Sequence, residues 1–521
     1  MRNWIWGAGA LLLFLVGFFA WKQSITAPDL AQGFLQRQAA AMRPDHEAEW
    51  EGLTEIPRYQ IRATVDPDSG EISGEMDLRF TNLSQDEIGQ LAFRLYPNAS
   101  SIYGGGSLTV TQATLAGNPL VQQTQQEGTV ANIQLPQALP PGGSLEVSLA
   151  FQGQVPAGFS QGYGIFNRSR GVLTLAGWYP VLAPYAHGWL TPAVPLVGDA
   201  MRAALALYEV DLNLPQGYQV ASTGAIVSSS PTSTPSPSLT RTGAENTDSS
   251  KSENWLHYRI VSGPAREFAL AASQKFEVTE TESNGVKLRY YALPAEKPLI
   301  QPQDALNMLA DVFRIYQDVY GSYPYNEFEL FEAPITIGGY EFSGMAMLDD
   351  GVRPQQGGAD YRYLMAHELA HQWWYGLVGT PTVTEPWLDE AHASYSAVIY
   401  LERRRNPATA QQQVRIWKQE YGLRKANQPP VNSPATDFTG WLSYRRTVYM
   451  HGALFLDALR QQIGDERFFT ILRTYQDTYR YKTGDTQTYL DAVRAGSGQD
   501  VEGLIETWFQ TTHNTAQDNE G

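Results

Sequence analysis

The pentapeptide HELAH at residues 367–371 constrains the fold of this chain more than any other feature. It lies in a stretch, residues 359–377, whose pattern is typical of a helix. Histidines four residues apart lie on one helix face, one turn from each other, so both imidazoles can bind one tetrahedral ion. The pattern fixes only three positions, and a chance match on a surface helix is the competing interpretation.

Glu390, nineteen residues after His371, is the predicted third ligand. It lies in a second predicted helix, residues 385–404, beside Trp387, which indicates a buried position where an unpaired carboxylate would be costly. If the two helices pack antiparallel, this carboxylate reaches the ion and leaves a fourth position for water. We therefore predict one Zn²⁺ per chain, bound by His367, His371 and Glu390.

Glu368, directly after the first histidine, is the predicted catalytic base. A zinc ion acts as a Lewis acid and lowers the pKa of its bound water to about 7. The Glu368 carboxylate can accept the proton of that water, so the pattern favours a hydrolase.

Composition excludes several other classes of protein. A chain of 521 residues that is 43% hydrophobic can form two or three domains with their own cores. Its net charge is −17, without a long basic run, which argues against nucleic-acid binding. The sequence has no cysteine, so histidines and carboxylates are the only strong metal ligands.

The N-terminus predicts a membrane anchor. Residues 4–21 carry no charge, and eighteen helical residues at about 1.5 Å each nearly cross a hydrocarbon core of about 30 Å. Arg2 precedes this segment, so we expect a single-pass membrane protein with a cytoplasmic N-terminus and an extracytoplasmic catalytic domain. A cleaved signal peptide and a buried helix are the alternatives. Residues 22–50 would form a stalk.

Residues 51–294 predict a β-rich, mostly antiparallel domain. A hairpin is expected around the turn at 66–70, since apolar residues alternate on both sides of it. Further strands are expected at 91–97, 107–115, 144–152, 208–214, 255–261 and 286–293. Residues 228–254 are rich in Ser, Thr and Pro, and predict a disordered loop inserted between two strands.

Residues 295–510 predict a mostly helical domain, followed by a tail at 511–521. The first helix repeats apolar residues at helical spacing and should end at Gly321. Further helices are expected at 359–377, 385–404, 406–425, 445–463 and 465–479, with strands near 328–337.

The motifs of this second half resemble the M1 family of zinc metallopeptidases, which includes aminopeptidase N and leukotriene A4 hydrolase. Besides HELAH, the similar blocks are YGSYPY at 320–325, GGYEFSGMAM at 338–347, WLDEAHASY at 387–395, VYMHGALFLDAL at 448–459 and GLIETWFQ at 503–510. The resemblance implies a multidomain α+β fold. An N-terminal antiparallel, saddle-like β domain would precede a mostly helical, thermolysin-like zinc peptidase domain, with an N-terminal transmembrane helix ahead of both.

The resemblance also implies roles for single residues. His367, His371 and Glu390 would bind zinc, and Glu368 would activate the water. Tyr449 would donate its hydroxyl to the tetrahedral intermediate, with Tyr444 as a weaker candidate for this donor. Glu341 would bind the free N-terminus of the substrate.

The sequence departs from the family pattern at several positions. Phe342 replaces an asparagine that contacts the substrate, His451 replaces a lysine, and Ala397 replaces a glutamate that orients a ligand histidine. The β-domain motif that supplies a second amine contact is not recognisable in residues 175–189. About 130 residues follow Glu390, so we expect a short form without the large C-terminal helical domain, and a more open site.

The resemblance implies a zinc-dependent aminopeptidase that removes N-terminal residues from peptides. Two alternatives stay open: another zinc hydrolase, either an endopeptidase or an epoxide hydrolase, and a non-catalytic scaffold that binds peptides. The expected partners are peptide substrates and a membrane, through the N-terminal helix, but not nucleic acid. Side-chain specificity and oligomeric state are not predicted.

Overall fold

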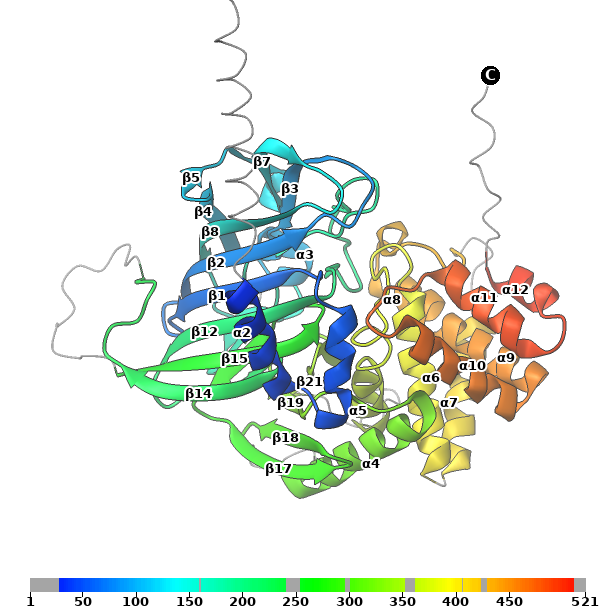
Figure 1. Cartoon of the computed structure of the whole chain (residues 1–521). Helices are drawn as coiled ribbons and strands as arrows, with labels where there is room; N and C mark the ends of the chain where they lie inside the picture. Colours follow the sequence, from blue (N-terminus) through cyan, green and yellow to red (C-terminus); the bar gives the residue numbers. More distant parts are fainter. Residues whose placement is uncertain are drawn as a thin grey trace, which may run out of the picture.

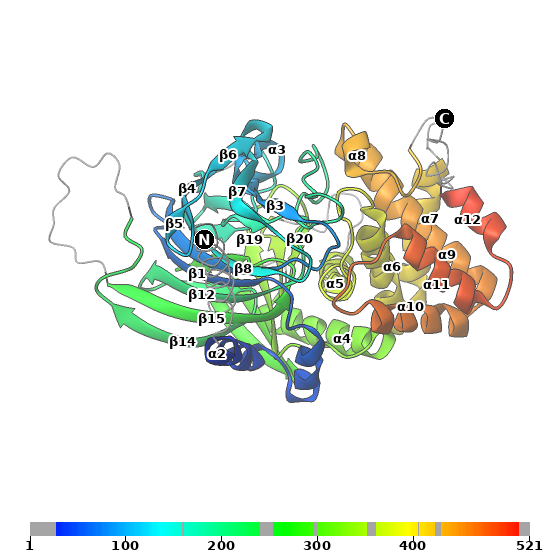
Figure 2. The ribbon, with the colours of Figure 1, turned by 45° about the horizontal axis from the view of Figure 1, so that its top comes forward.

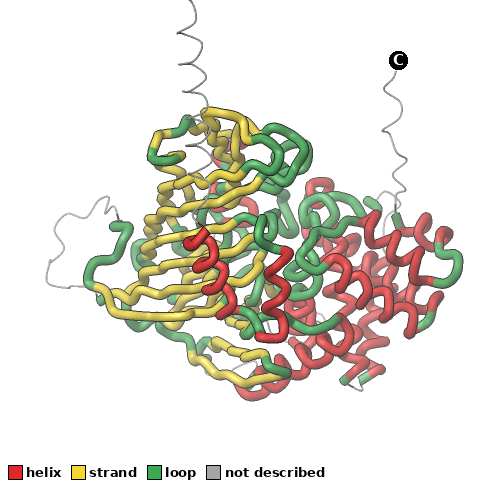
Figure 3. The backbone as a smooth tube through the Cα atoms, viewed as in Figure 1, coloured by secondary structure: helices red, strands yellow, loops and turns green. Residues whose placement is uncertain are grey.

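The computed structural model describes residues 28–158, 161–239, 254–295, 300–351, 361–404, 406–422 and 429–509. The described chain has a half made of sheets, which comes first in the sequence, and a half made mainly of helices (Figures 1 and 3). The multidomain α+β architecture predicted from the sequence is confirmed.

The first half is built on an eight-stranded sheet. The predicted hairpin is confirmed, because β1 pairs antiparallel with β2 from Arg58↔Arg79 to Val65↔Ile72. One pair departs from the expected antiparallel pattern, since β1 runs parallel to β12. Parallel strands need a long connection, and 140 residues separate these two. In order across the sheet, the strands are β14 (Ala225–Thr232), β15 (Trp255–Ala265), β12 (Ala206–Pro215), β1 (Arg58–Val65), β2 (Glu71–Thr81), β8 (Ser144–Gln154), β4 (Ser107–Leu115) and β5 (Asn118–Pro119).

Two four-stranded sheets enclose the core of this half against the large sheet. Trp178 lies at the centre of that core, fully buried, with its indole N–H donating to the Phe268 carbonyl at 3.1 Å. One sheet orders β13 (Gln219–Ser222), β16 (Leu270–Ser273), β10 (Val172–Leu175) and β9 (Phe166–Ser169). The other orders β11 (Val181–Leu182), β3 (Ile88–Arg94), β7 (Val130–Leu139) and β6 (Gln122–Gln125).

The predicted disordered loop at 228–254 begins inside a strand, because β14 extends to Thr232 and pairs there with Trp255 of β15. Of the remainder, residues 240–253 lie outside the described residues.

The second half contains a five-stranded mixed sheet. Its strands β17 and β18 fall within the range predicted for the β-rich domain, yet β18 pairs in parallel with β19. The sheet orders β17 (Glu277–Ser283), β18 (Val286–Ala292), β19 (Glu327–Ala333), β21 (Met345–Asp349) and β20 (Gly339–Phe342). Structurally, the second half therefore begins near residue 277.

Helices cover this sheet and form the rest of the second half (Figure 2). As expected, α4 ends at Gly321, whose φ of +111° suits glycine. The helices are α4 (Pro302–Tyr320), α5 (Tyr361–Ala370), α6 (Trp387–Arg403), α7 (Pro407–Gly422), α8 (Trp441–Tyr444), a π-helical segment (Arg445–His451), α9 (Gly452–Ile463), α10 (Asp465–Tyr479), α11 (Thr486–Ser497) and α12 (Glu502–Trp508). A short helix of the first half is α3 (Ser100–Tyr103).

The predicted transmembrane helix is wrong for the residues that the structure describes. With it falls the prediction of a single-pass membrane protein bound to a membrane. Among the described residues, no helix is both long and apolar enough to cross a bilayer. The longest, α4, has 19 residues and carries Asp304, Asp311, Arg314 and Asp318, charges that a hydrocarbon core would exclude. The predicted anchor at residues 4–21 lies outside the described residues.

Part of the predicted stalk lies against the eight-stranded sheet (Figure 1). The segment consists of α2 (Pro28–Gln38) and two 3₁₀ helices, Ala39–Ala41 and Pro44–Gly52. The Arg37 guanidinium pairs with Glu209 of β12 at 2.8 Å, and the buried Gln38 amide donates to the Tyr208 carbonyl at 3.0 Å. This segment is therefore packed on the body of the protein and is not a free spacer.

Candidate metal centre and active site

Helix α5 and the turn after it carry both histidines of HELAH. His367 lies in the last turn of α5, and His371 directly follows its end at Ala370. Both side chains are buried, and their Nε2 atoms lie 3.3 Å apart. The four-residue spacing thus places the two imidazoles together, as predicted.

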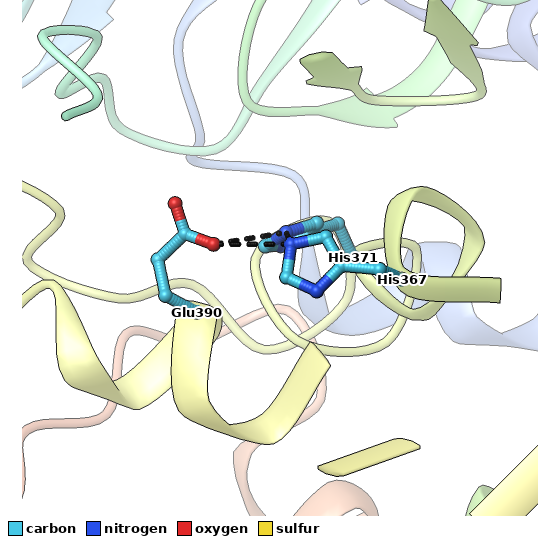
Figure 4. A group of neighbouring side chains, drawn as sticks. All are labelled: His367, His371 and Glu390. Carbon is cyan, nitrogen blue, oxygen red and sulfur yellow. Dashed lines mark hydrogen bonds and ion pairs between the residues drawn. The ribbon is translucent and has the colours of Figure 1, made fainter. Parts of the chain in front are cut away.

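Helix α6 brings Glu390 to the same point from its first turn. Glu390 Oε2 lies 3.2 Å from Nε2 of His367 and 3.5 Å from Nε2 of His371, and Figure 4 shows the carboxylate pointing at both rings. The ligand atoms of the three residues all lie within 4.8 Å of one another.

These three residues fit a zinc ion. Glu390 Oε2 is buried and has no hydrogen-bond partner among the described residues, a costly state unless a cation binds there. His371 Nδ1 lies 3.1 Å from the Trp374 carbonyl, and His367 Nδ1 lies 3.4 Å from Ser394 Oγ. Each imidazole therefore has a partner on its outer nitrogen, which leaves Nε2 for the metal.

The charges at this point perturb the pKa values of the ligands. Although burial opposes it, the two imidazoles hold the pKa of Glu390 below its ordinary value. Burial lowers the pKa of His367. Burial has the same effect on His371, but Glu341 and the other nearby carboxylates outweigh it and raise its pKa well above the usual value.

Glu368 lies beside the metal ligands without belonging to them. Its carboxylate, that of Glu341 and a nitrogen of His371 lie within 4.8 Å of one another. Burial raises the pKa of Glu368 well above its ordinary value, while His371 opposes this shift. Strand β20 passes close by, because a Cβ added to Gly339 would lie 2.3 Å from Glu368 Oε1.

Tyr449 comes from the π-helical segment, and a π-helical turn is frequently found at functional sites. Its hydroxyl donates to Glu390 Oε1, and its ring stacks on His367 with centroids 5.6 Å apart. Tyr444 is also buried nearby, with its ring centroid 5.8 Å from that of Tyr449. Among the described residues the Tyr444 hydroxyl has no hydrogen-bond partner.

Glu341 lies on β20 and is 5% exposed. Burial raises its pKa to about 8, and the negative charges of Glu390 and Asp389 add to this effect while His371 opposes it. The structure therefore brings all six predicted residues together.

Three residues of this centre were not predicted. Ser394 contacts His367 as described above, and Asp389 accepts hydrogen bonds from the Thr380 hydroxyl and the Glu390 amide. Asp199 comes from the first half of the chain, and burial together with the charges of Glu341 and Glu390 raises its pKa well above the ordinary value. Asp389 and Ser394 share the helix of Glu390, so their positions could have suggested them, but Asp199 lies in a long loop without periodicity.

The departures from the family pattern are buried. Phe342 packs in the core, and its carbonyl accepts a hydrogen bond from the Gln372 amide at 3.0 Å. The His451 ring lies over Trp508, with centroids 4.4 Å apart. Ala397 is fully buried on α6.

Known proteins resemble this chain in sequence and in fold. Residues 305–508 match the model of the peptidase family M1 domain. The chain is 26% identical over 161 residues to aminopeptidase N of Lactococcus lactis subsp. lactis, covering 28% of this chain and 18% of that protein. It is 26% identical over 257 residues to aminopeptidase M1 of Arabidopsis thaliana, covering 44% of this chain and 27% of that protein. The chain thus spans less than a third of the length of these curated relatives.

The crystal structure of an M1 zinc metallopeptidase from Deinococcus radiodurans superposes with a TM-score of 0.64 over 87% of this chain and 93% of that chain. At 18% identity this likeness concerns the fold. The family match covers the segment that contains both histidines and Glu390, whose donor atoms suit zinc. The cofactor of this chain is accordingly a zinc ion, and its residues 305–508 are similar to the peptidase family M1 domain.

Proposed function

We propose that this protein is a zinc-dependent aminopeptidase that hydrolyses N-terminal residues from peptides. The observation that carries the proposal is the buried group of His367, His371 and Glu390 with Glu368 and Glu341 beside it. In this proposal the first three residues hold the zinc ion. When bound, zinc supplies a Lewis acid for the scissile carbonyl and the attacking water.

Glu368 acts as the general base in the proposed mechanism. It is not one of the three proposed zinc ligands, and its carboxylate lies within 4.8 Å of both the Glu341 carboxylate and a nitrogen of His371. A base works best when its pKa lies near the working pH, and burial shifts the pKa of Glu368 in that direction. Glu368 would accept the proton of the attacking water and pass it to the leaving amine.

Tyr449 would stabilise the negative charge that develops on the carbonyl oxygen. Its hydroxyl lies at the metal ligand Glu390, so it can turn from that carboxylate to a substrate oxygen nearby. A hydroxyl with a raised pKa keeps its proton at neutral pH; burial and the charge of Glu390 raise the pKa of Tyr449.

Glu341 would restrict the enzyme to free N-termini. Its carboxylate is buried within 4.8 Å of the donor atoms of Glu368 and His371, where a substrate's α-ammonium would offset its charge. A blocked N-terminus cannot supply this charge. An endopeptidase would have no use for such a group.

The test is hydrolysis of aminoacyl fluorogenic substrates and their N-acetyl derivatives by the purified full chain, with and without a chelator. We expect zinc-dependent cleavage of the free amines only. Glu368→Gln should retain one equivalent of zinc by elemental analysis while kcat falls by on the order of 10² to 10⁴, the usual contribution of a positioned base. Equal cleavage of free and acetylated substrates would indicate an endopeptidase. No cleavage by the zinc-loaded protein would favour a binding scaffold.

A further inference from the structure

We propose that Tyr375 is a specificity-determining residue, which limits the size of the substrate's first side chain and so selects peptides that begin with a small residue such as alanine. This inference rests on the proposed aminopeptidase function and names the substrate class of the same site. Tyr375 lies in the turns that follow α5, four residues after the proposed zinc ligand His371.

The backbone of Tyr375 has a conformation that a side chain disfavours. Its φ is +127°. For a bulky residue a positive φ of this kind is an outlier, and it persists only where the surrounding structure holds it, most often at active sites and ligand-binding pockets. A glycine would adopt this conformation without strain. The tyrosine therefore destabilises the backbone at this point, which favours a role for its ring in binding.

Contacts from both halves of the protein hold Tyr375 in this conformation. Its amide donates to the Val378 carbonyl at 2.9 Å, and its own carbonyl accepts a hydrogen bond from the Arg266 guanidinium at 3.2 Å. Its hydroxyl donates to Glu267, which also accepts the Ser343 amide at 2.5 Å. Arg266 and Glu267 lie between β15 and β16. The first half of the chain thus fixes the ring of a residue of the second half.

The Tyr375 ring forms part of the wall of the cavity beside Glu341. The residues on either side of Glu341 in β20, Tyr340 and Phe342, also line this cavity, and so does Tyr103 of α3. Of these four aromatic residues, Tyr375 alone has a positive φ. Its ring is therefore the one whose position is set by contacts and not by the preference of its own backbone.

A substrate's first side chain has to enter this cavity for a geometric reason. In the proposed function the α-ammonium lies at Glu341 and the scissile carbonyl at the metal, and the side chain is attached to the carbon between these two groups. Its Cβ is thus two bonds from the nitrogen held at Glu341. Protein interiors are close-packed, so a ring that is buried and held at its backbone and at its hydroxyl does not yield to a large side chain. Tyr375 therefore sets how large that side chain can be.

The test removes the ring and measures which first residue the zinc-loaded full chain prefers. For the wild type we expect a higher kcat/KM on a fluorogenic alanyl substrate than on the matching phenylalanyl substrate. Tyr375→Gly relieves the backbone and leaves a space that the benzyl side chain of phenylalanine can fill. In this variant the ratio of kcat/KM for phenylalanyl over alanyl should rise by on the order of 10- to 100-fold, the usual effect of changed fit in an apolar pocket.

Two further variants separate the size of the ring from its other contacts. Tyr375→Phe keeps the ring but loses the bond to Glu267, so the ratio should stay within about 3-fold of the wild-type value. Tyr375→Ala opens the cavity but keeps a Cβ at the same φ. It should shift the ratio as Tyr375→Gly does, while melting at a lower temperature than the glycine variant.

An unchanged ratio in Tyr375→Gly, or a shift of the same size in Tyr375→Phe, would overturn the inference, and so would a wild type that prefers the phenylalanyl substrate. If Tyr375→Ala does not fold, the glycine variant decides the question alone. If the zinc-loaded wild type cleaves neither substrate, the proposed function itself fails, and the inference falls with it.

Discussion

Each of the three ligand residues at the metal centre keeps one donor atom free for the metal ion. His371 and His367 engage neighbours through Nδ1, and Glu390 gives Oε1 to Tyr449, so that two nitrogens and one oxygen converge. His367, His371 and Glu368 could be predicted because helix geometry converts sequence spacing into distance. Glu390 could be predicted from a second amphipathic helix and from the family resemblance. Asp199 could not, because a loop has no period and its approach to Glu341 depends on how the two halves pack.

Tyr449→Phe tests the proposed donor to the oxyanion. The hydroxyl is needed mainly in the transition state, so kcat should fall by on the order of 10² to 10³ while KM changes little. Steady-state kinetics with one aminoacyl substrate measure both constants. Tyr444→Phe is the matched control and should retain most of kcat; the reverse order of effects would make Tyr444 the donor.

Two elements, β20 and α5, approach each other closely at Gly339 and Glu368. The sequence predicted neither this approach nor the pairing of β17 and β18 with β19, because contacts between distant elements leave no local pattern. It did predict most elements themselves, such as β4 at 107–115 and α10 at 465–479, since their apolar periodicities are regular.

Gly339→Ala should therefore displace the catalytic base without removing the metal. A Cβ would lie 2.3 Å from Glu368 Oε1, and the flexible carboxylate would have to move. We expect kcat to fall by on the order of 10²-fold, because base catalysis depends on position. Zinc content and melting temperature should change little. A variant with wild-type kcat would show that Glu368 tolerates the shift and is not positioned by β20.

Strand β19 links the two halves through Glu329, whose carboxylate accepts the Ser222 amide of β13 at 2.6 Å. Burial raises the pKa of Glu329 to about 7, with Glu327 adding to the effect and Arg289 opposing it. The carboxyl group of Glu329 loses its proton at a lower pH in the unfolded chain than in the folded protein. The protonated group therefore stabilises the folded state most below pH 4.5, and this stabilisation declines as the pH rises to about 7.

Glu329→Gln removes this titration. Between pH 4.5 and 8, the wild type should lose on the order of 2 kcal/mol of unfolding free energy relative to the variant. Denaturant unfolding of the wild type and of the variant at several pH values gives this difference in unfolding free energy. The contributions of the other titrating groups are the same in both proteins and cancel. A constant difference across the range would mean that Glu329 has an ordinary pKa in the folded state.

At the scale of the whole molecule, metal binding should couple to folding. The ligands come from α5, the turn after it and α6, and the chain has no cysteine that could bind zinc after unfolding. A ligand that binds only the folded state stabilises it by about 2.7 kcal/mol when the free ligand concentration is 100 times its Kd. Chelation should lower the melting temperature of the wild type in calorimetry. His371→Ala should melt at one temperature with or without the chelator; a persistent shift would indicate a second metal site.

The segment that begins the described chain also contacts the residue that follows α10. Glu49 pairs with Arg480 at 3.2 Å, 431 residues further along, while Arg37 pairs with Glu209. At about 5 to 20 residues per second, a ribosome needs roughly 20 to 90 seconds to reach Arg480 after Glu49 has been made. Glu49 is thus synthesised early but is among the last residues to complete its native contacts, because its ion pair with Arg480 cannot form until synthesis is nearly finished.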